Sequence, residues 1–287
     1  MSSSSPSPKK KKQNKAKEAS ATGHTAPAKE HKGSGIFTRL ILYGIIPVVL
    51  VGLFFVLDPY VSKGYIFEPT VLHAAASKAL KAHGNASFDK VVDSIVATLE
   101  KRYPGHINKE QQWIFNNAGG IHPSHPPLIL ILRHHCAGAM GQMYLLHCSL
   151  TEYVIIFGTP IGTEGFTGRF LADDYFIILK GEQQAFNLGE FARESYKPGD
   201  MHHLPRGSAQ GYRCPDHCFA LEYARGWYGD DLALISFPAY TPSQRIPLMM
   251  PFGVADTLSS TLDFPTLYNT FYLYGKLVVR ELLLGKF

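Results

Sequence analysis

The feature that most constrains this chain is an uncharged apolar run at residues 40–57, LILYGIIPVVLVGLFFVL. A helix of this length crosses the hydrocarbon core of a bilayer. A cleaved signal peptide is the alternative, but the preceding leader is long and the DPYVSKGY that follows offers no small-residue cleavage site. The sequence therefore predicts a retained transmembrane anchor over residues 36–60.

Positive charges gather on the amino side of this run, in KKKKQNKAK at residues 9–17 and at Arg39. The positive-inside rule then places the N-terminus in the cytosol and the rest of the chain in a lumen. Residues 1–35 have no periodic apolar face and are predicted to be a disordered tail. The formal net charge of +5 is concentrated in this tail, and without a folded basic domain we predict no nucleic-acid partner.

Beyond the anchor, the pattern is first helical and then strand-like. Residues 69–103 place Val91, Val92, Ile95 and Leu99 on one helical stripe before the stop at Pro104. The later runs EYVIIFG, DDYFIILKG and HCFALEYARG are β-branched, aromatic and separated by glycines. Such strands predict a sheet closed into a barrel or a sandwich. The apolar helical pattern after residue 251 suits either a membrane surface or the mouth of the barrel.

One of these strands carries an isolated acid. In HCFALEYARGW, residues 217–227, alternation puts Glu222 on the same face as Ala220 and Ala224. A buried carboxylate without a partner is costly. Either this face is solvated or the acid has a function, and the residues alone leave both interpretations open.

Cysteine usage does not indicate a disulfide framework. The cluster CPDHC at residues 214–218 places two thiols near His217, but without a second ligand pair we predict no metal site. Asn85 begins an N-glycosylation sequon that would lie in the lumen. The chain has four cysteines in all: Cys136, Cys148, Cys214 and Cys218.

The segments EQQWIFNNAGG, HCSLTEYVIIFGTPIGTEGFTGRFLADDYFIILKG, YKPGDMHHL and ALEYARGW resemble the fungal sterol C-8 isomerases, relatives of the animal sigma non-opioid receptor. The resemblance spans residues 64–287, and TEGFTGRFLADDYF and HHL are closer to the fungal enzymes. It implies an α+β fold: one N-terminal transmembrane helix, a cupin-like β-barrel flanked by helices, and a C-terminal membrane-associated helical pair.

Two segments depart from the family pattern, residues 121–138 and 228–245. Without them, NNAGG runs almost directly into AMGQM and RGW meets IPLMMPFG, as the resemblance implies. Codons at both boundaries permit the GT and AG ends of an intron. We therefore hypothesise that both are translated introns, with genuine surface loops as the alternative; reverse-transcribed messenger RNA would distinguish them.

The resemblance implies an isomerase of ergosterol synthesis in the endoplasmic reticulum membrane. It would shift a sterol double bond from C8=C9 to C7=C8 by protonation and deprotonation through a carbocation. We expect no cofactor, because this chemistry needs none and the sequence has neither a P-loop nor a dinucleotide fingerprint. The implied partners are a Δ8-sterol, lipophilic cationic amine inhibitors and membrane lipid, while homo-oligomerisation is left open. A non-catalytic receptor for lipophilic amines and sterols is the alternative.

The resemblance also assigns site residues. Glu222 matches the family acid that holds cationic ligands, so we expect it to be catalytic. Of Asp173 and Asp174, a strand points only one toward the site, and the receptor's partner aspartate aligns with Phe176, which favours Asp174. His203, rather than His202, matches a pocket position, with a structural hydrogen bond as the alternative. The apolar ligand wall implied by the resemblance comprises Trp113, Tyr153, Ile155, Phe157 and Phe176.

Overall fold

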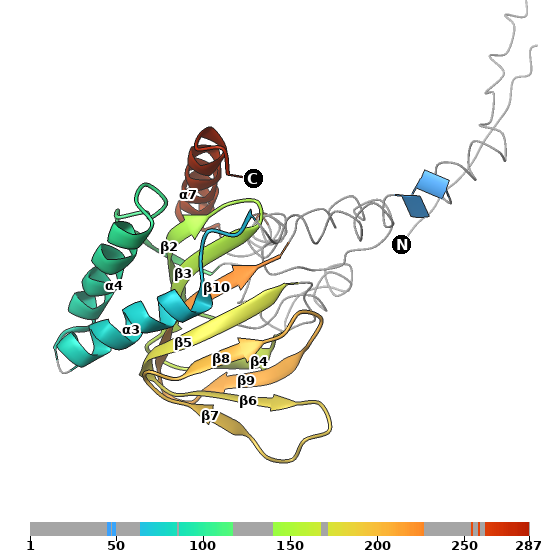
Figure 1. Ribbon diagram of the computed structural model, residues 1–287. Coiled ribbons are helices and arrows are strands. Elements are labelled where there is room, and N and C mark those ends of the chain that lie inside the picture. Colours follow the sequence, from blue (N-terminus) through green and yellow to red (C-terminus); the bar gives the residue numbers. More distant parts are fainter. Residues whose placement is uncertain are drawn as a thin grey trace, which may run out of the picture.

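The computed structural model describes residues 45–46, 48–49, 64–84, 86–116, 140–167, 172–226, 254, 258 and 262–286. The predicted tail, most of the predicted anchor, Asn85 and both suspected inserts lie outside the described residues. Within the described part, no helix has the length and apolar character needed to span a membrane. The described chain combines helices with antiparallel sheets (Figure 1).

The strands form two separate antiparallel sheets. The first has the order β1-β2-β3-β10-β5-β8 and the second the order β4-β9-β6-β7. Among the described residues no strand pairing joins them, so the predicted closed barrel is wrong. The strands are β1 (Trp113–Phe115), β2 (Gln142–Cys148), β3 (Glu152–Thr159), β4 (Thr163–Phe166), β5 (Asp173–Gly181), β6 (Gln183–Asn187), β7 (Glu194–Tyr196), β8 (Met201–Leu204), β9 (Gln210–Cys214) and β10 (Cys218–Arg225).

The sheets remain open because the chain crosses between them at tight corners. At Gly181 the chain leaves β5 and enters β6 of the second sheet, with a φ of +79° that glycine adopts without strain. A Cβ at this position would collide with the carbonyl oxygen of His217. Gly162, with a φ of +81°, makes the equivalent corner between β3 and β4. Strands that switch sheets at such corners produce two packed layers.

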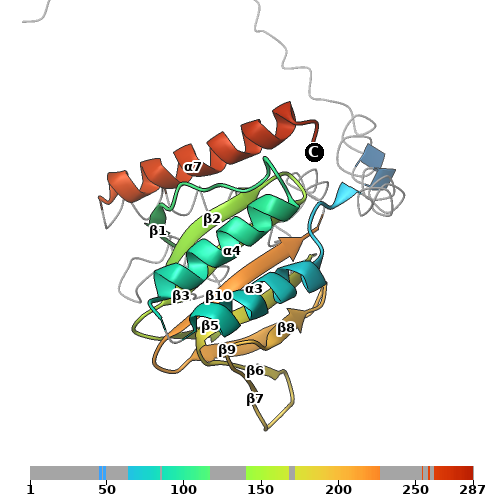
Figure 2. The ribbon, with the colours of Figure 1, turned by 60° about the vertical axis from the view of Figure 1, so that its left-hand side comes forward.

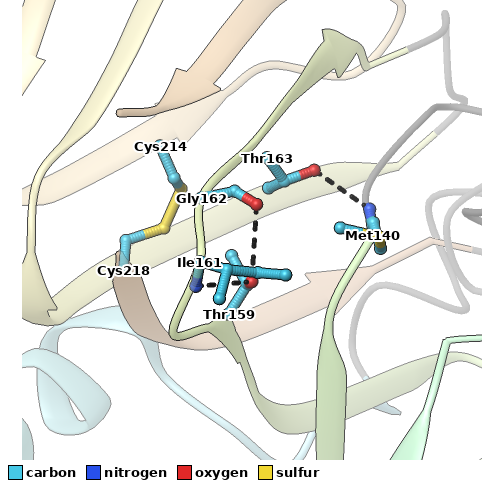
Figure 3. Close-up of a disulfide and its surroundings, with 7 residues drawn as sticks. All are labelled: Met140, Thr159, Ile161, Gly162, Thr163, Cys214 and Cys218. Atoms are coloured by element: carbon cyan, nitrogen blue, oxygen red, sulfur yellow. Dashed lines mark hydrogen bonds between the residues drawn. A yellow bond between two sulfur atoms is a disulfide. The ribbon is translucent and has the colours of Figure 1, made fainter. Parts of the chain in front are cut away.

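The third corner, between β9 and β10, carries a disulfide. Figure 3 shows Cys214 bonded to Cys218, beside the turn in which Thr159 Oγ1 accepts from the Ile161 N–H. These thiols are therefore paired with each other and not held as zinc ligands. The sequence did not indicate this disulfide, because the pattern CPDHC does not reveal the turn that brings its two cysteines together. A single short-range disulfide is also not a disulfide framework, so that part of the prediction is unaffected.

Two helices cover one face of the six-stranded sheet (Figure 2): α3 (Pro69–His83) and α4 (Phe88–Arg102). The stripe predicted on α4 is confirmed, because Val91, Val92, Ile95 and Leu99 are its buried residues. Burying such side chains contributes roughly 1.5–3 kcal/mol each. The strand residues in this core include Tyr144, Leu146, Val154, Ile156, Tyr175, Ile177, Leu221 and Tyr223.

The opposite face of the sheet is partly covered by α7 (Phe264–Leu283). Asp263 caps this helix, accepting a hydrogen bond of 3.2 Å from the Thr266 N–H. Leu273 and Leu277 pack in one cluster with Tyr153 of β3 and Ala224 of β10. This is one helix of the C-terminal pair that the resemblance implies; most of residues 246–261, where the other helix is expected, lie outside the described residues.

A buried polar network ties both ends of the described domain to the sheet. Glu152, which is fully buried on β3, accepts hydrogen bonds from the backbone N–H of Ile66 (2.6 Å) and of Phe67 (3.3 Å). Tyr223 Oη donates to the same carboxylate over 2.8 Å, and Lys286 Nζ lies 3.0 Å from it. The network therefore joins the segment before α3, two central strands and the residues after α7.

The pairing of β1 with β2 makes a prediction about the first suspected insert. Phe115 is opposite Gln142, and the Asn116 N–H donates to the Gly141 carbonyl over 2.9 Å. Deleting residues 121–138 would leave residues 117–120, 139 and 140 to connect Asn116 and Gly141, a length common among the connections of compact domains. We expect the deletion variant to keep the melting temperature and activity of the full chain. Loss of folded protein would contradict the intron hypothesis.

Candidate functional site

The candidate site lies on the face of the six-stranded sheet opposite α3 and α4. Glu222 is on the central strand β10, paired with Ile155 of β3 and with Phe176 of β5. The residue is only 3% exposed, so the alternative of a solvated strand face is wrong. Tyr153 Oη donates a hydrogen bond of 2.5 Å to Glu222 Oε1. This bond fixes the orientation of the carboxyl group within an apolar surrounding.

The structure places Asp174 on the same face. Asp174 is fully buried and pairs with Ala224, two residues from Glu222 on β10. The two carboxyl groups are thus diagonal neighbours on adjacent strands, a relation with a typical Cα separation of about 7–8 Å. The small side chains of Ala220 and Ala224 flank Glu222 on its own strand. The structure therefore brings two buried acids together on one face of the sheet.

Asp173 and His203 lie together on the other face. His203 Nε2 is 2.9 Å from Asp173 Oδ1, and both side chains are about a third or more exposed, at 40% and 32%. The His203 ring stacks on Tyr175 with centroids 4.3 Å apart. The prediction that Asp173 and Asp174 point to opposite faces of the strand is therefore confirmed. Asp174 is the one on the face of Glu222.

The expected apolar wall is brought together only in part. Tyr153, Ile155 and Phe157 of β3 and Phe176 of β5 share the face of Glu222. Trp113 instead pairs with Tyr144, with ring centroids 6.0 Å apart, and packs on the core beneath the helices. Trp113 is therefore separated from Glu222 by the sheet itself.

His202 is a site-facing residue that the sequence reading passed over. His202 is on β8 and pairs with Phe176 of β5, so it lies on the face of Glu222 and Asp174. Its ring stacks on Tyr196 at 4.4 Å, and burial lowers its pKa from the usual value. Choosing between His202 and His203 requires the register between β5 and β8, which no local pattern in MHHL discloses.

A second polar cluster lies at the end of α7. Ligand atoms of His106, His147 and Glu281 lie within 4.8 Å of one another. Arg280 Nη2 is 2.9 Å from Glu281 Oε1, and His106 Nδ1 is 2.6 Å from Oε2. Burial lowers the pKa of His147 to about 3, so its ring is neutral. Because Arg280 already balances the Glu281 charge, we assign this cluster to anchoring α7.

The fold and the site together define a mixed helix-and-sheet protein with two buried carboxyl groups on one face of an antiparallel sheet. The chain belongs to the family described as ERG2 and Sigma1 receptor like protein. The family profile matches residues 44–124, 131–237 and 243–286. Both interruptions fall inside the suspected inserts.

Several fungal relatives are similar over most of their length. A protein of Aspergillus fumigatus named C-8 sterol isomerase erg2 is 46% identical over 83% of this chain and 85% of its own. The C-8 sterol isomerase ERG2 of Gibberella zeae is 41% identical over 94% of this chain and 99% of its own. The sigma non-opioid intracellular receptor 1 of Gallus gallus is more distant, at 33% identity over 76% and 82%. An RmlC-like cupin from Shewanella frigidimarina is 16% identical over 31% of this chain and 79% of its own, with a TM-score of 0.28.

Proposed function

We propose that this chain is a C-8 sterol isomerase, which shifts the C8=C9 double bond of a sterol to C7=C8. The main observation that supports this proposal is the pair of buried acids, Glu222 and Asp174, on one apolar face of the sheet. Family membership and the fungal relatives named C-8 sterol isomerase support the same activity.

The reaction adds one proton to an alkene carbon and removes one proton from a neighbouring carbon. In our proposal a protonated carboxyl group donates its proton to C9, which leaves a tertiary cation at C8. A carboxylate facing the cation stabilises it, and loss of the proton on C7 forms the new double bond. Buried neighbouring acids favour one protonated and one ionised member, which supplies both the proton and the negative charge. The hydrogen bond from Tyr153 orients Glu222 for this step.

Burial of the rigid apolar ring system supplies most of the substrate affinity, at roughly 25 cal/mol per Å². Tyr153, Phe157 and Phe176 provide apolar surface on the face of the two acids. A protonated lipophilic amine would imitate the carbocation and therefore act as an inhibitor at the same place.

A non-catalytic receptor is the second candidate, because the same buried acids would also hold an ammonium group and the animal receptor is 33% identical. Expression in isomerase-deficient yeast separates the two. We expect the chain to convert the accumulated Δ8-sterols to Δ7-sterols. Persistence of Δ8-sterols despite folded, correctly located protein would favour the receptor.

We further propose that residues 36–60 anchor the protein in the endoplasmic reticulum membrane, with the folded domain in the lumen. Disulfides persist in such oxidising compartments, and Cys214 and Cys218 form one. In this proposal the outer surface of α7 lies on the membrane. Its exposed large apolar residues include Phe264, Tyr268, Phe271, Tyr272, Val279 and Leu283.

The Lys-rich tail is predicted to be dispensable for chemistry. Residues 1–35 carry no periodic apolar face that could pack on the folded domain. Deleting Ser2 to Lys32 should leave the isomerase rate within about twofold of the full chain, which is within ordinary surface effects. Loss of activity in a variant that still inserts into membranes would contradict this prediction.

A further inference from the structure

His202 is a buried polar group that the acid pair does not explain. It is 3% exposed, and among the described residues no hydrogen bond of normal length and angle reaches either ring nitrogen. The side chain of Gln210 lies close enough to act on the ring as a weak hydrogen-bond partner and raises its pKa, as does the charge of Glu194. Desolvation outweighs both and lowers the pKa, so the ring is neutral at physiological pH.

The position of His202 relates it directly to the two acids. Phe176 of β5 pairs with Glu222 on one side and with His202 on the other. His202 and Glu222 therefore face the same way two strands apart, a separation of roughly 10 Å at the usual strand spacing. Asp174 lies diagonal to both. The remaining surface between them is apolar and includes Phe176, Ile178, Leu204 and Ala220.

The chemistry of this ring suits a hydroxyl group. A neutral imidazole offers one N–H donor and one nitrogen acceptor, and a hydroxyl likewise donates and accepts. Gln210 can serve only one ring nitrogen, so a buried polar atom of the ring stays without a partner, which is unfavourable; a ligand hydroxyl that pairs with this nitrogen removes that penalty and gains affinity. The proposed substrate carries a hydroxyl at C3 of its first ring, while its reacting double bond is in the second ring.

We propose that His202 binds the C3 hydroxyl of the sterol and thereby positions the reacting double bond over Glu222 and Asp174. This inference rests on the proposed sterol isomerase function. The hydroxyl end of the substrate lies toward β8, and the reacting carbons lie over β5 and β10. His202 is then the residue that requires a hydroxylated substrate, while the apolar face accepts any ring system of similar shape.

The test compares a Δ8-sterol with its 3-deoxy counterpart, using purified full-length protein. Wild type should prefer the hydroxylated sterol by roughly 10- to 100-fold in binding, the scale for a buried site that pairs a hydroxyl. His202→Leu should bring this ratio close to one, while His202→Gln, which can still donate and accept, should keep part of it. His203→Gln is the matched control, because the neighbouring histidine lies on the other face, and should retain the wild-type ratio.

The ratio distinguishes a binding role from a structural one, because poorer packing weakens both ligands equally. An unchanged ratio in His202→Leu, with a normal melting temperature, would overturn the inference. If His202→Leu does not fold, His202→Phe decides, because it keeps a ring against Tyr196 but has no hydrogen-bonding atom: an unchanged ratio in this variant would overturn the inference. If wild type binds and converts sterols but does not distinguish the hydroxylated sterol from its 3-deoxy counterpart, this inference alone is overturned. Absence of any sterol binding or turnover would overturn the proposed function as well.

Discussion

Replacing Glu222 by Gln is expected to reduce isomerisation by on the order of 10³-fold or more, the scale for removing a group that acts at the transition state. Glutamine keeps the size of the buried side chain and can still accept from Tyr153. It can neither supply the proton nor carry the negative charge that faces the cation. Turnover of a Δ8-sterol by purified wild-type and variant protein measures this effect.

The same variant should separate charged from neutral ligands. A protonated lipophilic amine should bind about 2–5 kcal/mol more weakly, as expected when a desolvated charge pair is broken. A neutral sterol should lose far less, because apolar burial carries its affinity. Equal losses for both ligands would indicate a damaged site.

Glu164→Gln is a suitable control, because Glu164 is 74% exposed on β4 and pairs with Arg213 at the surface. It should leave turnover and both affinities close to those of wild type. A Glu222→Gln protein that turns over at near the parental rate would remove Glu222 from the mechanism.

Local periodicity predicted much of this fold. The stripe on α4 and the alternation around Glu222 are both confirmed, because each depends only on neighbouring residues of one element. The same alternation separated Asp174 from Asp173. The assignment of Trp113 to the ligand wall, which the resemblance implied, was wrong. The strand that carries Trp113 has only three residues, and so short an alternation does not reveal which face packs on the helices.

Features that depend on long-range pairing could not be read from the sequence. The corners at Gly162 and Gly181 decide that the strands divide between two sheets, and their effect depends on carbonyl groups elsewhere in the chain. The cluster of His106, His147 and Glu281 joins residues distant in sequence through α7. Side-chain periodicity within one element carries no information about such contacts.

Replacing Glu152 by Gln is expected to reduce the free energy of unfolding by about 3–5 kcal/mol, the range for breaking a buried ion pair. Glu152 is fully buried, accepts from Ile66 and Phe67 N–H groups and from Tyr223, and lies 3.0 Å from Lys286 Nζ. An amide places an N–H₂ group where a donor already points, and it leaves the Lys286 ammonium, only 9% exposed, without its counter-charge. Denaturant unfolding in detergent measures the loss.

Two further variants assign this loss to the buried pair. Glu110→Gln removes a surface partner of Lys276 whose side chain is 68% exposed, and it should cost less than about 1 kcal/mol. Adding Lys286→Met to Glu152→Gln should recover part of the stability, because the uncompensated ammonium is then gone. If Glu152→Gln alone unfolds within about 0.5 kcal/mol of wild type, where neutral surface substitutions fall, the network does not hold the ends of the domain to the sheet. Recovery in the double variant would instead show that the buried charge of Lys286, and not lost packing at β3, causes the instability.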